Sequence, residues 1–273
     1  MPGIRDYAVY TDRMRRSMWD KAFFMDKVPG TEAIVDYGCA DGSLVCFLSG
    51  LFPAMRFIGF DIDPAMVAQA NGQRRENTWF FSDPEEVRRQ LRALGISGEQ
   101  TTVNFSSVFH EIFSYGFDTG RIRRFLEEIS PSYVTVRDMM YRGPAADTPV
   151  SPEAEARARS AIPAWQIADF EAVFGSIRLR RNLTHLLLKT NYTENWSREC
   201  RENYFSVTRE ELMAVLNPAG RFRVLYEACY TLPWIRRDVA DRLGLDLGDG
   251  ATTHLSLILG RRGGTPAVTL DTP

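Results

Sequence analysis

The chain has 273 residues, of which 44% are hydrophobic and 25% are charged, and its formal net charge is −2 at pH 7. This composition is typical of a globular protein, and the length favours one α/β core with an elaboration. The lack of a basic excess argues against a dedicated nucleic-acid binder, and no uncharged apolar run reaches the roughly 20 residues that span a bilayer.

The N-terminus and the cysteines indicate a cytoplasmic protein. Charges occur throughout the first 21 residues, which lack the apolar region and cleavage site of a secretory signal. The four cysteines form no C-x-x-C pair and the three histidines lie far apart in the sequence, so no metal-site spacing is present, although a cluster assembled only by folding stays open. We expect no metal and no membrane association, and the sequence leaves the oligomeric state undetermined.

Strands and helices alternate through the first half of the chain. Apolar residues at loosely helical spacing predict a helical segment over residues 1–30. Apolar runs and turn residues then predict strands over 33–37, 56–60, 78–81, 101–106 and 133–137, and helices over 43–50, 64–70, 83–94 and 121–129. Five β units separated by helices predict an α/β fold with a doubly wound, mostly parallel sheet.

The alternation stops after Asp138. Residues 139–206 contain helical patches at 153–160, 165–174 and 182–189, and they are too long for a plain connection. Because this segment follows the carboxyl end of a strand, we interpret it as a helical insertion or lid that binds an acceptor; a cap that only stabilises or dimerises is the alternative.

The core is then expected to resume. A helix over 209–216 and strands over 222–230 and 253–259 complete seven strands, so the predicted Rossmann-like core comprises residues 31–138 and 207–262. The tail, 263–273, is expected to be disordered.

Glycines and acidic residues at the ends of the first three predicted strands indicate a nucleoside-binding site. Gly38 and Gly42 lie between the first strand and the first helix, where a backbone can approach a ligand closely. Asp61 ends the second strand 23 residues beyond Gly38, near the offset at which an acid binds ribose hydroxyls. Ser82 and Asp83 end the third strand, where a side chain could meet an adenine amine; for Asp83 a helix N-cap is an equal and compatible reading.

The same segment argues against a dinucleotide. A G-x-G-x-x-G fingerprint would require glycine where the chain has Ala40 and Ser43, and the carboxylate of Asp36 would oppose a pyrophosphate. A cationic ligand without phosphate tolerates that acid, because an ammonium group pairs with a carboxylate.

In these motifs the sequence resembles the class I S-adenosylmethionine-dependent methyltransferase family. The matching segments are 36–42 (DYGCADG), 60–63 (FDID) and 82–83 (SD), within an order of elements that matches over 31–138 and 208–260. The resemblance implies S-adenosylmethionine as cofactor, with Asp36 and Gly38 near its methionine part, although Ala40 departs from the glycine that is common in the family. The expected cofactor-binding residues are Asp36, Gly38, Ala40, Gly42, Asp61, Ile62, Ser82, Asp83 and Ser106.

Residues 106–115 follow the fourth strand, at the edge that would face the sulfonium. His110 could act as a base near neutral pH, Glu111 could orient it or bind a cation, and Tyr115 could hydrogen-bond or pack against the sulfonium. A histidine that only caps the sheet is the alternative.

Three further residues are predicted to bind the acceptor: Arg137, Asp138 and His185. A structural ion pair is the alternative for Arg137 and Asp138, which end the fifth strand, and packing of the insertion is the alternative for His185.

The sequence thus predicts a methyltransferase with a small-molecule acceptor. One alternative is an RNA acceptor held by groups of arginines, although nucleic acid is not favoured. Another is an enzyme that uses the aminobutyl-carboxyl chain of the cofactor and releases methylthioadenosine, and a further one is a cofactor-binding scaffold without activity.

Overall fold

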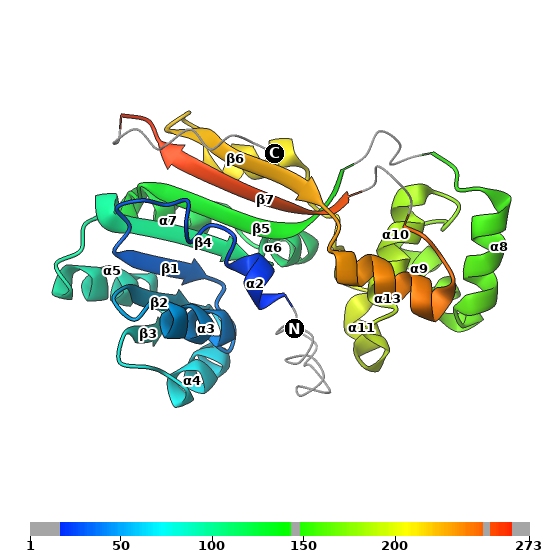
Figure 1. The fold of residues 1–273 in the computed structure, drawn as a ribbon, viewed down its shortest axis with the longest axis horizontal. Helices are drawn as coiled ribbons and strands as arrows, with labels where there is room; N and C mark the ends of the chain where they lie inside the picture. The colour runs from blue at the N-terminus through cyan, green and yellow to red at the C-terminus, as the bar shows by residue number, and fades with distance from the viewer. Residues whose placement is uncertain (1–16, 143–147, 248–251, 264–273) are drawn as a thin grey trace.

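The computed structural model describes residues 17–142, 148–247 and 252–263. Its centre is a seven-stranded sheet in the order β3-β2-β1-β4-β5-β7-β6 (Figure 1). The strands are β1 (Ala33–Tyr37), β2 (Arg56–Phe60), β3 (Thr78–Phe81), β4 (Thr101–Ser106), β5 (Tyr133–Arg142), β6 (Phe222–Tyr230) and β7 (Thr252–Arg261). The first five strands are parallel to one another, whereas β7 runs antiparallel to both β5 and β6, so the predicted fold class is confirmed.

Helices cover both faces of the sheet. One face carries α2 (Met18–Lys21), α3 (Ser43–Leu51) and α4 (Pro64–Gly72), and the other carries α5 (Pro84–Ala93), α6 (Phe109–Tyr115), α7 (Gly120–Ile129) and α12 (Arg209–Leu216), while the short η1 (Gly98–Gln100) precedes β4. Strand residues alternate between the two layers: Val35 joins the core beneath α7, and its neighbour Ile34 joins the core beneath α3. Apolar residues of the buried strands therefore face both layers of helices.

The starts of α4 and α5 follow from local sequence. The side chains of Asp63 and Asp83 accept hydrogen bonds from the backbone N–H groups of Ala65 and Glu85, and a proline occupies the first turn of each helix. Both helices begin immediately beyond the carboxyl ends of their strands, so the local signals place the loops of this edge.

A second group of helices forms a separate layer beside the sheet. It contains α8 (Pro152–Ala161), α9 (Ala164–Phe174), α10 (Arg180–Lys189), η2 (Thr193–Asn195), α11 (Trp196–Glu199) and α13 (Pro233–Leu243). These elements share a hydrophobic core that includes Phe170, Leu186, Trp196 and Val239. We call residues 148–206 and 231–247 the helical lobe; Figure 1 shows it at one end of the sheet.

Helix α13 changes the predicted boundary between the core and the insertion. The sequence analysis assigned residues 207–262 to the core, but Ile235 and Val239 of α13 pack within the lobe. The pattern missed this helix because its few apolar residues are separated by arginines and aspartates, and their burial depends on lobe helices distant in the sequence.

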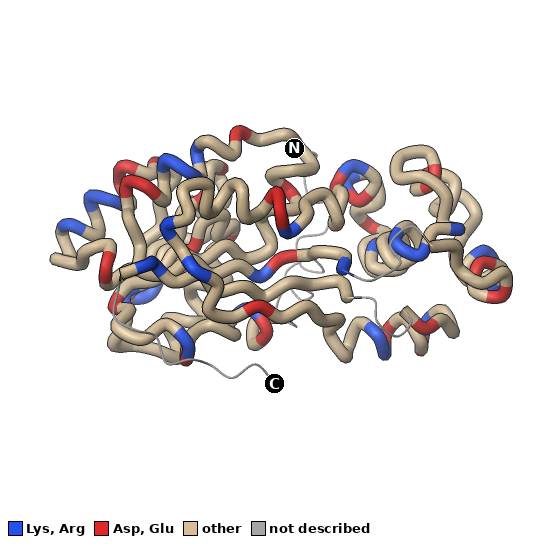
Figure 2. Tube along the Cα trace, turned by 90° about the horizontal axis from the view of Figure 1, so that it is seen from above, with Lys and Arg blue, Asp and Glu red and all other residues tan. Residues whose placement is uncertain are grey.

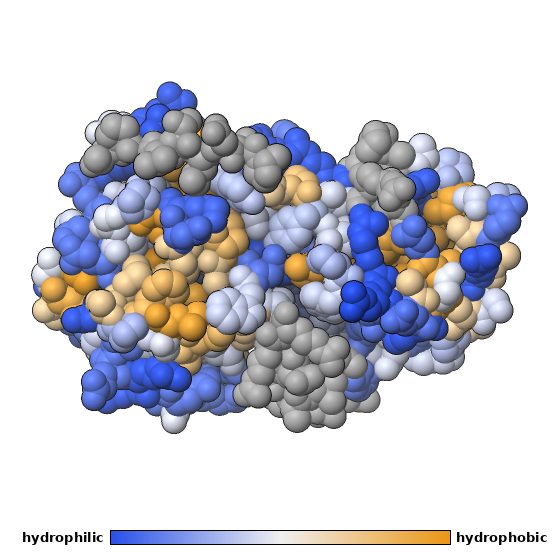
Figure 3. All heavy atoms as spheres, in the orientation of Figure 1, coloured by the Kyte–Doolittle hydropathy of each residue, from blue (hydrophilic) through white to orange (hydrophobic). Residues whose placement is uncertain are grey.

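The predicted segment 1–30 is described only from residue 17, where α2 forms, and residues 264–273 of the predicted tail lie outside the described ranges. Acidic and basic residues are interspersed over the core and the lobe (Figure 2). Large exposed apolar side chains also occur on both parts, among them Leu51 on the core and Trp165 on the lobe, and hydrophobic surface is visible on both in Figure 3. No helix in the described ranges has the length and apolar character needed to cross a membrane.

Candidate functional site

The turn from β1 to α3 depends on glycine. Gly38 and Gly42 have φ angles of +80° and +76°, a region that residues with side chains seldom adopt. A Cβ on Gly42 would also lie 2.6 Å from the Phe80 ring. Ala40 adopts φ +47° at the position where the resembling family has glycine, so the turn keeps its shape at a strain cost of about 1–2 kcal/mol.

Asp61 connects the first two loops of this edge. Its carboxylate accepts hydrogen bonds from the backbone N–H groups of Ala40 and Asp63, both at 2.9 Å. Burial raises the pKa of Asp61, and the neighbouring Ile62 leaves 47% of its surface exposed. An acid and an apolar surface therefore lie side by side at the end of β2.

A cavity of about 340 Å³ opens beside these loops, and we call it the first cavity. Its walls include Gly38, Asp61, Ile62, Val108 and Phe117. The charged groups that line it are Asp61, Glu111, Asp118 and Arg121, so acids exceed bases.

The other predicted cofactor residues take different places. Asp36, Ala40 and Gly42 lie behind the first cavity, as parts of the strand and turn that shape it, and Ser106 is buried at the end of β4. Ser82 and Asp83 are exposed and do not line the cavity, and the Asp83 carboxylate caps α5. In the structure, Asp83 therefore acts as the N-cap of α5.

Asp36 is buried within a polar chain that crosses the sheet. Its Oδ1 accepts a hydrogen bond of 2.7 Å from Nδ2 of Asn104, whose own Oδ1 accepts one of 2.8 Å from Thr135. Burial raises the pKa of Asp36 to about 6.

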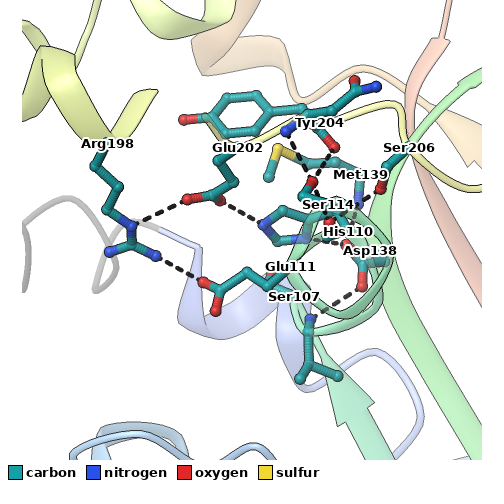
Figure 4. A network of polar contacts seen from close by, with 12 residues as sticks. Ser107, His110, Glu111, Ser114, Asp138, Met139, Arg198, Glu202, Tyr204 and Ser206 are labelled. Atoms are coloured by element: carbon teal, nitrogen blue, oxygen red, sulfur yellow. Dashed lines mark hydrogen bonds and ion pairs between the residues drawn. The ribbon is translucent and has the colours of Figure 1, made fainter. Parts of the chain in front are cut away.

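His110 lies between two carboxylates (Figure 4). Its Nδ1 is 2.5 Å from Oδ1 of Asp138, and its Nε2 is 2.9 Å from Oε1 of Glu202. Burial opposes the charged imidazolium, but both carboxylates outweigh this effect and raise the pKa of His110 to about 10. His110 is therefore a protonated donor to both acids.

This arrangement corrects the prediction of a free base at His110. Both ring nitrogens are occupied, and the ring is only 3% exposed. The sequence could not reveal this, because Glu202 is 92 residues away along the chain.

Arg198 extends the network from the lobe to the core (Figure 4). Its Nε is 3.0 Å from Oε2 of Glu202, and its Nη2 is 2.7 Å from Oε1 of Glu111. Burial and the nearby Glu202 raise the pKa of Glu111 to about 6. Ligand atoms of His110, Glu111 and Glu202 lie within 4.8 Å of one another, a spacing that a metal could bridge, but Arg198 and the protonated His110 already supply positive charge there.

A second cavity, of about 110 Å³, lies between the core and the lobe. Its lining residues include Lys21, Ser107, His110, Glu111, Arg137, Tyr192, Glu199, Glu202, Tyr204, Trp234 and His254. Glu111 lines both cavities, so this residue lies where they adjoin.

The predicted acceptor-binding residues are only partly brought together. Arg137 lines the second cavity, where its Nε is 2.6 Å from Oδ2 of Asp20 and its Nη1 donates to Ser107 at 3.1 Å. Asp138 is fully buried and accepts hydrogen bonds from the N–H groups of Val108 and Phe109 at the start of α6, so an acceptor cannot reach it. That prediction is wrong because the acid serves the helix terminus and His110.

His185 and Tyr115 also lie away from the second cavity. The His185 ring is buried against Phe170 and Phe174, and its Nε2 accepts a hydrogen bond from the N–H of Tyr204. Burial lowers the pKa of His185 well below its usual value, so the ring is a neutral part of the lobe core. The structure therefore corrects the prediction that His185 contacts the acceptor. Tyr115, at the end of α6, lines neither cavity.

The sequence analysis missed Lys21, Arg198 and Glu202. Arg198 and Glu202 lie within the predicted insertion among other charged residues, and their spacing carries no recognisable signal. Lysine is rare, with 3 residues against 30 arginines, and this rarity is the only sequence feature that sets Lys21 apart.

Comparison with known proteins rests on structure. No family model matches this sequence, and no curated protein matches it. An S-adenosylmethionine dependent methyltransferase from Mesorhizobium loti is similar in structure, with a TM-score of 0.51 and 16% identity, covering 90% of this chain and 97% of the other. The plantazolicin methyltransferase BamL, in complex with a triazolic desmethylPZN analogue and SAH, has a TM-score of 0.50 and 12% identity, covering 92% of this chain and 88% of the other. The chain therefore has the Rossmann-like fold of S-adenosylmethionine-dependent methyltransferases.

Proposed function

We propose that this protein is an S-adenosylmethionine-dependent methyltransferase with a small-molecule acceptor. The observation that carries the proposal is the placement of Glu111 between two cavities, one beside the glycine turn and Asp61, the other beneath the helical lobe. A cofactor in the first cavity and an acceptor in the second would meet at this residue.

The lining of the first cavity suits the proposed cofactor in polarity and charge. Asp61 offers a carboxylate for ribose hydroxyls, while Ile62, Val108 and Phe117 offer apolar surface for an adenine ring. The excess of acids along the lining suits a cationic ligand and opposes a pyrophosphate. The presence of SAH in the structure of BamL supports the same ligand class.

The cofactor, when bound, supplies a methyl group on a positively charged sulfur. The residues of this chain would align the two reactants, since methyl transfer requires the reacting atoms about 3–3.5 Å apart and in line. Glu111 can accept a proton from an acceptor at neutral pH, because its pKa of about 6 leaves it mostly ionised. Arg198 holds the Glu111 carboxylate, and His110 holds Glu202 in the position that orients Arg198.

The second cavity supports an acceptor of small size. Its volume of about 110 Å³ is below the roughly 300 Å³ at which drug-sized ligand sites begin. Aromatic side chains, including Tyr192, Tyr204 and Trp234, surround charged groups there, a lining suited to a compact molecule with polar and apolar parts. A polymer would need an extended groove instead.

Calorimetry tests the cofactor assignment directly. The parent protein should bind S-adenosylmethionine, and Asp61→Asn should weaken binding by about tenfold or more, because a charge-assisted contact to ribose is lost. Absence of binding to the parent protein contradicts the proposal, and unchanged affinity in the variant removes the ribose assignment.

Product analysis tests the reaction. A screen of cell extract for compounds that gain a methyl group should yield S-adenosylhomocysteine together with the methylated acceptor. Methylthioadenosine as the product would instead indicate use of the aminobutyl-carboxyl chain, and methylated RNA would contradict the small-molecule acceptor.

A further inference from the structure

Arg137 is a buried cation in the wall of the second cavity. Only 4% of its surface is exposed, and the strand that carries it, β5, runs towards the helical lobe (Figure 1). Burying a guanidinium group is costly unless polar or charged groups satisfy its donors. The groups bonded to Arg137 therefore show which of its donors remain for a ligand.

Two neighbours fix the guanidinium group through two of its nitrogens. Nε lies 2.6 Å from Oδ2 of Asp20 on α2, and Nη1 donates to Oγ of Ser107 at 3.1 Å. Nη2 carries further N–H donors and bonds to no residue in the parts of the chain that the structure describes. Because Nη2 is not a fully buried atom without a partner, it keeps accessible surface, and the second cavity is the space that Arg137 lines.

Ser107 adds a second donor beside Arg137. Its backbone N–H donates to the carbonyl oxygen of Arg137 at 2.7 Å, and it adopts a φ angle of +58°, which residues other than glycine seldom do. Its Oγ accepts a hydrogen bond from Arg137, and its hydroxyl proton goes to no residue within the described ranges. Ser107 also lines the second cavity, so a hydroxyl and a guanidinium group offer donors side by side.

The acids of the second cavity already have cationic partners within the protein. Glu111 and Glu202 pair with Arg198, and Glu199 lies 3.6 Å from Nζ of Lys189. A ligand that bonds to the outer nitrogen of the buried arginine must instead supply acceptor atoms itself. An anionic group does so with the greatest gain, because charge-assisted hydrogen bonds are stronger than neutral ones.

A carboxylate suits these donors better than a phosphate. Its two oxygens lie in one plane, and one can accept from Nη2 of Arg137 while the other accepts from the hydroxyl of Ser107. A phosphate would bring more negative charge into a cavity of about 110 Å³ whose wall already contains three carboxylates.

We propose that Arg137 and Ser107 bind a carboxylate of the acceptor, so that this enzyme methylates a small carboxylic acid at another of its atoms. This inference rests on the proposed function, since it names the acceptor class for the second cavity. Apolar side chains of the helical lobe also line this cavity and offer surface for the carbon skeleton of the acid: Leu188, Leu232 and Ile235.

The reacting atom would face Glu111, which lines the second cavity where it adjoins the first. A lone pair of that atom forms the new bond to the methyl carbon, and the sulfur keeps the electrons of the bond that breaks. The proton lost by the acceptor goes to the Glu111 carboxylate. The carboxylate held by Arg137 takes no part in these steps and serves only to bind and orient the acceptor.

The test measures formation of S-adenosylhomocysteine by the parent protein from S-adenosylmethionine and a small-molecule extract of cells. One portion of the extract is untreated, one is treated with carbodiimide and methylamine to convert carboxylates to amides, and one is treated with phosphatase. The untreated and phosphatase-treated portions should support turnover, and amidation should abolish it. Turnover that survives amidation or is lost after phosphatase overturns the carboxylate assignment. A methyl ester as the product would make the carboxylate the reacting group and would also overturn it.

Arg137→Gln tests the arginine itself. The amount of extract that gives half the maximal rate should rise by about tenfold or more, because a charge-assisted contact is lost. Affinity for S-adenosylmethionine, measured by calorimetry, should stay within about threefold of the parent protein. Arg142→Gln is the matched control, because it removes an arginine that also belongs to β5 and pairs with an acid but lies outside both cavities. It should leave both quantities unchanged.

Ser107→Ala keeps the ion pair between Asp20 and Arg137, and it carries the test if Arg137→Gln does not fold. It should raise the amount of extract needed by about threefold to tenfold. An unchanged requirement for extract in the folded variants overturns the proposal. A folded Arg137→Gln that loses affinity for S-adenosylmethionine assigns the arginine to the cofactor and overturns it as well. Absence of turnover with the untreated extract contradicts the proposed function, on which the acceptor class depends.

Discussion

The core and the helical lobe bury charge in different ways. In the core, Asp36, Arg137 and Asp138 lie at or near the carboxyl ends of parallel strands, beside the loops and the cavities. In the lobe, Lys189 is completely buried among apolar helices, with its Nζ 3.8 Å from the centre of the Tyr204 ring and 3.6 Å from the Glu199 carboxylate.

The two sets of buried charges have different roles. The core charges form one edge because parallel topology brings every strand end to the same side of the sheet. The Lys189 ammonium instead donates to the carbonyl oxygen of Glu202, whose side chain reaches His110 in the core. The lobe thus uses buried charge to position a residue that acts across the boundary.

The largest expected effect on stability follows removal of His110, whose charge links Asp138 of the core to Glu202 of the helical lobe. His110→Ala leaves Asp138 and Glu202 without their shared partner, and we expect the free energy of unfolding to fall by about 3–5 kcal/mol at pH 7. Denaturant titration measures it.

The effect of His110→Ala should depend on pH. The pKa of His110 is higher in the folded state, at about 10, than its ordinary value of 6.5, so its stabilisation is complete below pH 6.5 and is lost as the pH rises towards 10. The loss caused by the variant should therefore shrink over this interval. His185→Ala is the matched control, because His185 is buried and neutral and its cost should stay constant. A constant cost for His110→Ala would contradict the ion-pair assignment.

A smaller effect is expected within the lobe. Lys189→Met removes the cation beside Glu199 and the donor to the Glu202 carbonyl, which should lower the free energy of unfolding by about 2–3 kcal/mol. The control Lys27→Met removes a half-buried lysine whose ion-pair partner, Asp26, is exposed, and it should cost at most about 1 kcal/mol. Affinity for S-adenosylmethionine should stay within about threefold of the parent protein; a larger loss would show that the lobe contributes to the cofactor site.

Glu111→Gln tests the residue that both cavities share. The variant keeps the shape of the side chain but cannot take up a proton, so kcat should fall by about a hundredfold if the acceptor must lose one. In the parent enzyme kcat should rise with pH through about 6, as Glu111 ionises, and this limb should vanish in the variant. Equal kcat in both proteins would limit Glu111 to an orienting role.

The smallest effect is expected at Asp83, for which the sequence allowed both a helix N-cap and an adenine contact and the structure shows the N-cap. Asp83→Ala removes the cap of α5 and should lower the free energy of unfolding by about 1 kcal/mol. Cofactor affinity should change by less than about threefold, in contrast to Asp61→Asn. A loss as large as that of Asp61→Asn would restore the predicted adenine contact.

Local signals in the sequence were sufficient for most of the core. Apolar runs located the strands, and the N-caps at Asp63 and Asp83 located two helices almost to the residue. The same signals placed Gly38 and Asp61 at one edge, because the alternation of strands and helices already implied a parallel sheet. These features depend on residues close together in the chain.

Tertiary structure decided the roles of the charged residues. The sequence showed a histidine after the fourth strand, but only folding brought Asp138 and Glu202 to its two nitrogens and made it a cation. Lys21 gained its place over the strand ends through the ion pair of Asp20 with Arg137, 117 residues away. The chain thus determined by itself where a ligand edge would form, whereas the protonation states and partners at that edge were set by burial and by contacts between distant residues, which no local pattern contains.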